Sequence, residues 1–349
     1  MIKAFTSPNQ FLHDPSFEIY EYGQRIRYFE SPERLQKMLS DLPKDGLVAI
    51  AMAEPATVDQ ISCHDQDYLT FLQTIYTRWE LEAPRDAKRY HSLFPVSQRP
   101  SSSQLDATSI PALLGTYVKD LSAPIMRGTW QAALASAGCA IAGVNEFMLQ
   151  DDTLHKNIAV ALCRPPGHHA GISSCAGYCY INNAALAANV ILQNRSVAIL
   201  DIDYHAGNGT QQIFYENPQV PVCSIHADPA NEYPYFAGFA NETGSGAGLG
   251  FHKNLPLPSG TDPEAYINTL SEALEWLASK PTDTLVLSAG FDTYKDDPLG
   301  CFKLTTDTYH TIGSLISKLG KPVLVVLEGG YKISMLPTNL LALLHGLSE

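Results

Sequence analysis

Three side chains that can bind a metal or move a proton, those of Asp201, Asp203 and His205, occupy alternate positions after an apolar run at 197–200. The length and β-branched composition of this run are typical of a buried parallel strand. Side chains two positions apart in an extended chain point to the same side, so the three groups are expected to converge. Two carboxylates and an imidazole are costly to bury unpaired, and a divalent cation held by Asp203 and His205 would remove that cost. A hydrogen-bonded polar cluster at a strand end is the alternative that this segment alone leaves open.

Polar residues follow four apolar segments in total, each in a turn that contains glycine. In chain order they are His168 and His169, then Asp201, Asp203 and His205, then Asp292, and finally Tyr331. Ligands of open parallel sheets bind beyond the carboxyl ends of the strands, so these side chains are expected to meet at one edge of a sheet. Each turn alone has a purely structural explanation, but the coincidence of four favours a functional site.

The side chains expected at this edge suit the hydrolysis of an amide. Asp203, His205 and Asp292 supply three ligands, and three protein ligands with one open position are typical of catalytic zinc. Such a metal lowers the pKa of bound water and polarises a carbonyl oxygen. A histidine can take the proton of the water and return it to a leaving amine, and a tyrosine hydroxyl can donate to the developing oxyanion. The sequence contains no G-x-S-x-G motif that would supply a covalent nucleophile.

The elements that must position these groups alternate along the chain between strands and helices. Apolar segments predict strands at 2–5, 47–51, 158–162, 197–203, 220–226, 284–288 and 322–327. Caps and helical periodicity predict helices that begin near 31 and 64, helices over 129–149, 182–193 and 262–279, and a last helix at the C-terminal end. This alternation predicts an α/β protein, with a single-domain open parallel sheet over 1–349 and helices on both of its faces.

Two irregular segments are interpreted as surface structure. The segment 84–111, rich in Pro, Ser and Arg, is predicted to be a long surface loop rather than a linker, because apolar strands continue on both sides. The glycine-rich segment 244–250 does not join a strand to a helix, so a surface turn is expected there rather than a dinucleotide-binding loop.

Composition excludes several classes of protein. The chain has 349 residues, of which 45% are hydrophobic, and its formal net charge is −13. The acidic balance argues against nucleic-acid binding and favours a cationic substrate. No apolar run approaches the ~18 residues that span a membrane, and the N-terminus lacks the features of a signal peptide. Seven cysteines without a regular framework suggest reduced thiols. A cytoplasmic protein without a membrane or nucleic-acid partner is therefore expected.

Two other potential ligand groups have simpler interpretations. Cys175 and Cys179 lie close in sequence to the histidine pair, but no second Cys or His pair with suitable spacing follows to complete a structural zinc site. His64 has no matching ligand at helical or strand spacing, so it is predicted to hold a loop through hydrogen bonds.

The motifs at the four strand ends resemble those of the zinc-dependent histone deacetylase superfamily. They are RPPGHHA at 164–170, GYCYINN at 177–183, DIDYH at 201–205 and EGGY at 328–331. The similarity covers nearly the whole chain. It is greatest to the bacterial acetylpolyamine amidohydrolases, through Gly-Thr-Trp at 128–130, Asp-Pro at 228–229 and Glu-Thr-Gly at 242–244.

The resemblance implies the arginase–deacetylase fold and a role for each matching residue. His169 would act as general base and then as general acid, with His168 as its electrostatic partner. Tyr331 would polarise the acyl carbonyl. The residues implied to orient the two histidines are Asp201 for His168 and Asn208 for His169. The ligands implied for one Zn²⁺ per chain are Asp203, His205 and Asp292.

The resemblance also implies a substrate channel, structural potassium and a dimer. The channel residues would be Gly177, Glu18 and the two aromatic walls Tyr178 and Tyr233. One potassium ion would be held, partly through backbone oxygens, by Asp201, Asp203, His205, Ser224 and Ile225, and a second by Phe214, Asn217 and Val220. A homodimer is expected, because polyamine enzymes of this type place a loop like 84–127 over the site of the partner.

The sequence departs from the family pattern at several positions. Ala206 stands where relatives usually have a second histidine, but that position is not a ligand, so activity is expected to survive. Pro111 and Ser122 stand where polyamine enzymes carry acidic residues, whereas Glu18 matches an acidic residue of those enzymes. The carboxylates that could serve a second positive charge of the substrate at the rim are Glu18, Asp106 and Asp120.

Three functions remain open at this point. The first is a metal-dependent deacetylase for small acetylated amines such as acetylpolyamines, and the second is the same hydrolase acting on acyl-lysine in proteins or peptides. The third is a non-catalytic binding protein or a ureohydrolase of the sister arginase branch. The intact histidine pair and Tyr331 argue against an inactive protein. Ala206 and Asn208 lie where a second metal would need further ligands.

Overall fold

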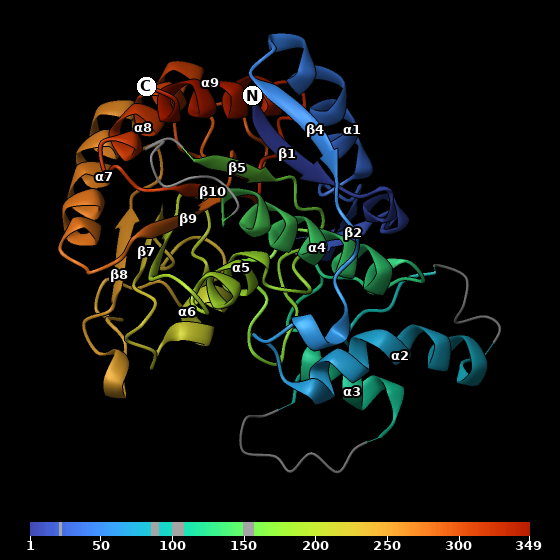
Figure 1. Cartoon of the computed structure of the whole chain (residues 1–349). Helices are drawn as coiled ribbons and strands as arrows, with labels where there is room; N and C mark the ends of the chain where they lie inside the picture. Colours follow the sequence, from blue (N-terminus) through green and yellow to red (C-terminus); the bar gives the residue numbers. More distant parts are fainter. Residues whose placement is uncertain (21–22, 85–90, 100–107, 149–156) are drawn as a thin grey trace.

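A parallel sheet of eight strands forms the centre of the described part of the chain (Figure 1). The computed structural model describes residues 1–20, 23–84, 91–99, 108–148 and 157–349. In spatial order the strands are β4 (Val48–Met52), β1 (Ile2–Thr6), β5 (Ile158–Ala161), β10 (Val323–Leu327), β9 (Thr284–Ala289), β6 (Val197–Asp201), β7 (Val222–Ala227) and β8 (His252–Leu257). All neighbouring pairs in this sheet are parallel, which confirms the predicted fold class.

Helices cover both faces of the sheet, as predicted. One apolar core lies between the sheet and α4 (Thr129–Met148) and α5 (Asn183–Ile191), and it continues to α2 (Gln66–Glu82) and α3 (Ile110–Tyr117). The other lies between the sheet and α1 (Pro32–Asp41), α7 (Pro263–Ala278), α8 (Thr306–Ser317) and α9 (Leu336–Leu347). Strand β10 serves both cores: Leu324 and Val326 point into the first, and Val323, Val325 and Leu327 into the second.

Local sequence explains where several helices begin and how closely they pack. The side chain of Asp262 accepts a hydrogen bond of 2.9 Å from Ala265 N and so caps α7. The side chain of Asn182 caps α5 in the same way. Helix α4 is rich in small residues and lies against β10, where a Cβ on Gly143 would be 2.5 Å from Cδ1 of Leu324. The small side chains of α4 therefore allow it to approach the sheet closely.

The structure adds elements that the sequence did not predict. They are α3, α6 (Asn208–Phe214), α8, β8, and a two-stranded hairpin of β2 (Glu18–Tyr20) and β3 (Gln24–Ile26). Strand β6 ends at Asp201, two residues earlier than predicted, because the backbone N–H groups of Asp203 and His205 bond to the preceding carboxylates instead of a neighbouring strand. The glycine-rich segment forms a short 3-10 turn over Gly246–Gly248, in agreement with the prediction of a surface turn.

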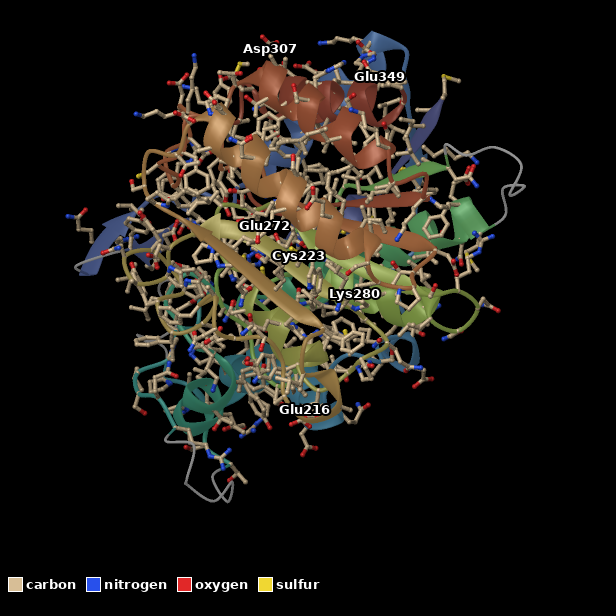
Figure 2. All side chains as sticks on the ribbon, turned by 90° about the vertical axis from the view of Figure 1, so that its left-hand side faces the viewer. Glu216, Cys223, Glu272, Lys280, Asp307 and Glu349 are labelled. Atoms are coloured by element: carbon tan, nitrogen blue, oxygen red, sulfur yellow. The ribbon has the colours of Figure 1, made fainter. Side chains whose placement is uncertain are left out.

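Several charged residues lie at the surface of the molecule. Glu216, Glu272, Asp307 and Glu349 are exposed, whereas Cys223 of β7 is fully buried beneath α7 (Figure 2). Within the described ranges, no helix has the length and apolar character needed to cross a membrane. Part of the predicted loop at 84–111, including Asp106, lies outside the described residues.

Candidate active site

The four polar sets meet at one edge of the sheet, as predicted. They follow β5, β10, β9 and β6, and these strands are consecutive neighbours in the sheet. Their ends are also in register: Ala161 pairs with Val326, and Ser288 pairs with both Val326 and Asp201. The carboxyl ends of four central strands therefore present their turns to one common volume.

Asp203, His205 and Asp292 form a buried group that suits a metal ion. Their potential ligand atoms lie within 4.8 Å of one another. Nδ1 of His205 is 3.3 Å from Oδ1 of Asp203 and 3.2 Å from Oδ2 of Asp292. This arrangement confirms that the three predicted ligands come together.

The chemistry of this group fits a divalent cation. Oδ2 of Asp292 is buried and forms no hydrogen bond with the described residues, although Nδ1 of His205 lies 3.2 Å away. A Cβ on Gly329 would lie 2.3 Å from that oxygen and 2.6 Å from Oδ2 of Asp203, so only glycine leaves both oxygens free of a side chain here. Two buried carboxylates next to an imidazole are typical donors for a zinc-like ion.

The histidine pair lies beside this group, with each ring held by a second side chain. The ring centroids of His168 and His169 are 3.9 Å apart. Nδ1 of His168 is 3.0 Å from Oδ2 of Asp201, and Nδ1 of His169 is 2.7 Å from Oδ1 of Asn208. The two orienting contacts implied by the resemblance are thus present in the structure.

Burial and neighbouring charges shift the pKa values of the two histidines in opposite directions. Burial alone would lower the pKa of His168, but the carboxylates of Asp203 and Asp201 raise it to about 10. Burial lowers the pKa of His169 well below its usual value, and the nearby rings of His168 and His205 lower it further. His169 is therefore the neutral member of the pair and the one able to accept a proton.

Tyr331 is held by groups that the sequence analysis did not identify. Its backbone N–H donates to Oδ2 of Asp297 at 2.6 Å. The buried Arg34 donates to the carbonyls of Gly330 and Glu328 at 2.8 and 2.6 Å, and its guanidinium lies 5.0 Å from the centroid of the Tyr331 ring. Both residues bind the backbone around Tyr331 and so set the position of its hydroxyl.

A second buried arginine completes the ion network behind Tyr331. The carboxylate of Glu30 lies 3.0 Å from both Arg34 and Arg164, and all three side chains are almost fully buried. Arg164 also donates to the carbonyls of Gln10 and His13, each at 2.6 Å. The first residue of the RPPGHHA motif is therefore an anchor for the N-terminal segment.

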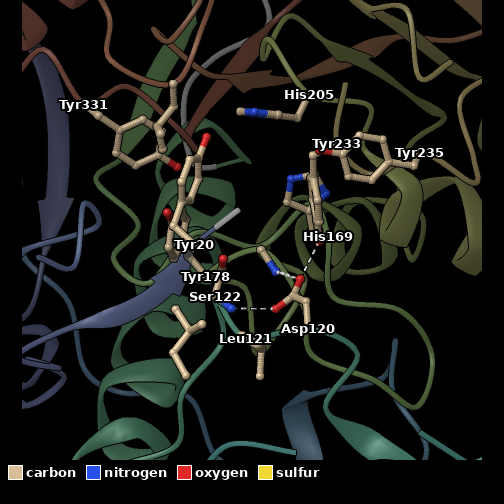
Figure 3. Close-up of a pocket in the computed structure, with 13 residues that line it drawn as sticks. Tyr20, Asp120, Leu121, Ser122, His169, Tyr178, His205, Tyr233, Tyr235 and Tyr331 are labelled. Atoms are coloured by element: carbon tan, nitrogen blue, oxygen red, sulfur yellow. Dashed lines mark hydrogen bonds between the residues drawn. The ribbon is translucent and has the colours of Figure 1, made fainter. Parts of the chain in front are cut away.

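The pocket over this centre has a volume of about 320 Å³ and is lined largely by aromatic side chains (Figure 3). His169, His205 and Tyr331 line it, and Tyr178 and Tyr233 form two of its walls. Gly177 also lines it with a φ of +48°, and a Cβ there would lie 2.5 Å from Cδ2 of His169. The positive φ and the close approach both require glycine at this position.

Two of the three carboxylates predicted at the rim, those of Glu18 and Asp120, accept hydrogen bonds from tyrosines of the pocket wall. Glu18 is fully buried behind Tyr178, whose hydroxyl donates to Oε2 of Glu18 at 2.8 Å. Asp120 lines the pocket and accepts a hydrogen bond from the hydroxyl of Tyr233. Ser122 also lines the pocket, whereas Pro111 belongs to α3. Glu18 therefore stands behind the aromatic wall, whereas Asp120 is partly exposed in the pocket.

Comparison with known proteins agrees with this geometry. A family model described as histone deacetylase domain matches residues 28–347. The chain is 38% identical over 350 residues to the acetylpolyamine amidohydrolase of Mycoplana ramosa, with 99% of this chain and 100% of that protein covered. It is 40% identical to acetylpolyamine amidohydrolase 1 of Pseudomonas aeruginosa, with 99% and 98% covered. The chain belongs to the histone deacetylase family.

The structure of another member of the histone deacetylase family superposes closely. The crystal structure of acetylpolyamine aminohydrolase from Burkholderia pseudomallei is 35% identical in sequence and matches with a TM-score of 0.93, covering 99% of this chain and 98% of that chain. Family membership makes the present chain an amidohydrolase of the deacetylase type.

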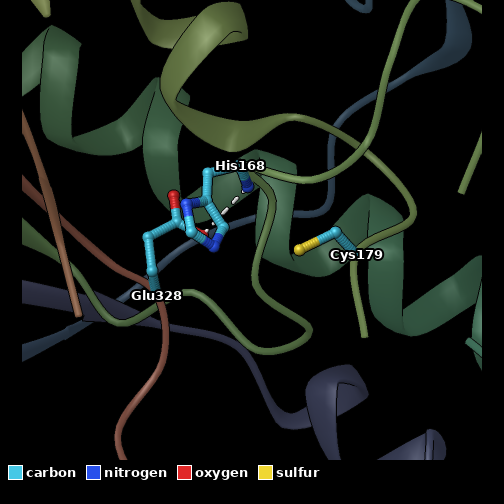
Figure 4. Close-up of side chains that lie close together, drawn as sticks. All are labelled: His168, Cys179 and Glu328. Carbon is cyan, nitrogen blue, oxygen red and sulfur yellow. Dashed lines mark hydrogen bonds between the residues drawn. The ribbon is translucent and has the colours of Figure 1, made fainter. Parts of the chain in front are cut away.

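A second cluster of potential metal ligands lies next to the group of Asp203, His205 and Asp292, and it has a structural explanation (Figure 4). Potential ligand atoms of His168, Cys179 and Glu328 lie within 4.8 Å of one another. However, Oε2 of Glu328 already accepts hydrogen bonds from Gly167 N and His168 N at 2.7 and 3.1 Å, and Oε1 accepts from Ser288 at 2.9 Å. Burial raises the pKa of the Cys179 thiol well above its usual value, which makes it a poor ligand. Glu328 therefore serves to hold the histidine turn.

The other potential ligands behave largely as the sequence predicts. Nδ1 of His64 bonds to the carbonyl of Gly171 at 2.8 Å, and its Nε2 accepts from Asn182 N at 2.9 Å, which confirms the prediction that His64 holds a loop. Among the described residues, Cys175 does not join any group of three potential metal ligands. A structural zinc site at Cys175 and Cys179 is therefore not supported.

The residues implied for potassium occupy two places near β7. In the pairing of β6 with β7, Asp201 lies opposite Ser224, which brings the members of the first group, including Ile225, close to the centre. In the second group, the carbonyl of Phe214 accepts from Asn217 N and contacts Nε2 of His252, each at 2.8 Å. Val220 precedes β7. Potassium at either place stays a prediction.

Proposed function

We propose that this protein is a zinc-dependent deacetylase that hydrolyses acetylated small amines, with acetylpolyamines as its preferred substrates. The observation that carries this proposal is the convergence of His169, His205 and Tyr331 on one pocket, next to the buried carboxylates of Asp203 and Asp292. Relatives that match almost the whole chain are named acetylpolyamine amidohydrolases, which supports this substrate class. The net charge of −13 suits a cationic substrate.

The protein groups around the centre divide the reaction between them. Zinc bound by Asp203, His205 and Asp292 would lower the pKa of water and polarise the acyl oxygen. Nδ1 of His169 faces the side-chain oxygen of Asn208, so its proton is held there and Nε2 is left to accept a proton and later return it to the leaving amine. The hydroxyl of Tyr331 donates to the oxygen that gains negative charge.

A panel of acetylpolyamines, acetyl-lysine peptides and simple acetamides tests the proposal. We expect both acetylpolyamines and acetyl-lysine peptides to be hydrolysed, because the narrow aromatic pocket admits both acyl-amine chains. We expect kcat/KM to be highest for acetylpolyamines and lower for acetyl-lysine peptides. Hydrolysis of acetyl-lysine peptides alone would identify a protein deacetylase instead. Failure to hydrolyse any acetylated amine would favour a binding protein.

The selectivity for cationic substrates should depend on pH through Glu18. Burial raises the pKa of Glu18 to about 7. Hydrogen bonds from the Phe29 amide, Tyr178 and Ser122 lower the pKa and so oppose part of this rise. The charge of Asp120 raises it further. Glu18 is therefore neutral below pH 7 and negative above it. We expect kcat/KM for an acetylpolyamine, divided by that for a neutral acetamide, to rise by roughly two- to fivefold as the pH increases from 6 to 8.

The Glu18→Gln variant provides the control for this pH dependence. It keeps the shape of the side chain and removes its ionisation, so the ratio should become independent of pH. Titration of the catalytic groups affects both substrates and cancels in the ratio. An unchanged pH profile of the ratio in Glu18→Gln would show that Glu18 does not sense the charge of the substrate.

We also infer a cytoplasmic homodimer, with one catalytic domain over 1–349 and structural potassium in each chain. The dimer follows from the resemblance to enzymes whose loop like 84–127 covers the site of the partner. Light scattering at several protein concentrations tests the dimer, and potassium titration monitored by thermal unfolding tests the ion.

A further inference from the structure

Hydrogen bonds to both oxygens hold the carboxylate of Asp120 in one orientation. Oδ2 accepts hydrogen bonds from the Tyr233 hydroxyl and from Gly177 N, each at 2.7 Å. Oδ1 accepts from Ser122 N and Ala123 N at 3.0 and 3.1 Å. Three of these donors are backbone groups, so Asp120 is fixed and the Tyr233 hydroxyl is the one side chain that it orients (Figure 3).

This contact restricts what Tyr233 can offer to a substrate. A tyrosine hydroxyl has one proton to donate, and here that proton goes to Asp120. The remaining capacity of its oxygen is to accept a hydrogen bond. The negative charge of Asp120 behind the hydroxyl strengthens the oxygen as an acceptor. A tyrosine whose donor was free would instead bind donors and acceptors alike.

Tyr233 spans the pocket from the catalytic centre toward its opening. Its ring makes an edge contact with His169 at a centroid distance of 4.9 Å. Its hydroxyl bonds to Asp120 and lies beside Gly177, where a Cβ would be 2.9 Å from it. Asp120 is partly exposed, whereas His169 is buried. Figure 3 shows Asp120 and Ser122 at the end of the pocket away from His205. The acceptor therefore lies beside the chain attached to the scissile nitrogen.

We propose that Tyr233, oriented by Asp120, is a specificity-determining residue whose hydroxyl oxygen accepts a hydrogen bond from an ammonium group of the substrate. That ammonium group is separated from the scissile amide by a short methylene spacer. The inference rests on the proposed deacetylase function and adds the residue that selects the amine. Acetylated diamines and polyamines carry such a group, whereas the side chain of acetyl-lysine has only methylenes at this depth.

The experiment compares two substrates that differ in a single group. One is an N-acetylated linear diamine, and the other is the N-alkyl acetamide in which a methyl group replaces the ammonium. In Tyr233→Phe we expect kcat/KM for the diamine to fall roughly tenfold, mainly through KM, because one charge-assisted hydrogen bond is lost. For the neutral acetamide it should change by less than about twofold.

Two further variants separate the hydrogen bond from a general effect on the fold. Asp120→Asn keeps a hydrogen-bonding side chain and removes the charge. It should therefore lower the ratio of kcat/KM for the diamine to kcat/KM for the neutral acetamide, while Tyr233 is present. Tyr215→Phe removes a hydroxyl from a tyrosine that does not line this pocket and should leave the ratio unchanged. Thermal unfolding of each variant checks that the fold is intact.

The outcomes distinguish this inference from the proposed function. If Tyr233→Phe lowered kcat/KM equally for both substrates, or for neither, the proposed role of Tyr233 would be overturned. Hydrolysis by the wild type would still support a deacetylase. A wild-type protein that hydrolyses neither substrate would refute the proposed function itself.

Discussion

Replacing Tyr331 by phenylalanine should lower kcat by about 10²- to 10³-fold and leave the metal content unchanged. The substitution removes one hydroxyl donor from the pocket. The ring is kept, with its contacts to Tyr178 at 5.6 Å and to the guanidinium of Arg34 at 5.0 Å. The backbone of residue 331 still donates to Asp297, so the turn should not move. The expected loss is therefore one of transition-state stabilisation rather than of structure.

Steady-state kinetics and metal analysis of the same preparations measure this effect. KM for the acetylated amine should change far less than kcat, because the hydroxyl acts on the oxygen that becomes negative during the reaction. If the phenylalanine variant turned over at the wild-type rate, Tyr331 would have no role in polarising the acyl group.

Replacing Asp203 or Asp292 by alanine should abolish both metal binding and hydrolysis. Each variant removes one of three ligands and leaves an incomplete site. Chelation of the wild-type protein should have the same effect on activity, and added zinc should restore the wild type but not the variants. Elemental analysis should find about one zinc-like ion per wild-type chain.

A remote aspartate provides the matched control for the ligand variants. Asp262 caps α7 and lies outside the ligand group, so Asp262→Ala should retain the metal while it loses about 1 kcal/mol of stability. Full hydrolytic activity in a wild-type preparation shown to be free of metal would refute the metal-dependent mechanism.

The convergence of the candidate site residues could be predicted from sequence because each one follows a buried strand. Central parallel strands such as β10 are apolar on both faces, so their positions are visible as continuous apolar runs. The polar residues that end these runs must lie at the same edge of the sheet. No assumption about side-chain packing is needed for that conclusion. The structure brings Asp203, His205 and Asp292 together, and His205 and Tyr331 line one pocket.

The supporting residues could not be predicted because their roles depend on distant contacts. Arg34 follows Glu30 by four positions, a spacing that is equally typical of an exposed ion pair on a helix. Its burial follows from contacts with carbonyls near the other end of the chain. Glu18 was expected at the rim but is buried, whereas Asp120 is partly exposed. Both accept hydrogen bonds from tyrosine hydroxyls that approach from other loops.

Elements at the margins of the sheet also lacked a clear signal. Strand β8 contains Lys253, Asn254 and Pro256 and pairs only with β7 among the described strands, so it does not form an apolar run. Helix α6 begins at Asn208, shortly after the DIDYH motif, where the pattern of candidate site residues conceals the helical one.

The contact of Arg34 with Gly330 joins residues 296 positions apart, and it has a consequence for synthesis of the protein. While a ribosome makes the chain, the buried arginine near the N-terminus cannot meet its carbonyl partners until the last strand and turn have been added. The wall behind Tyr331 is thus assembled from an earlier and a much later part of the chain. A nascent chain that still lacks Gly330 cannot complete this wall.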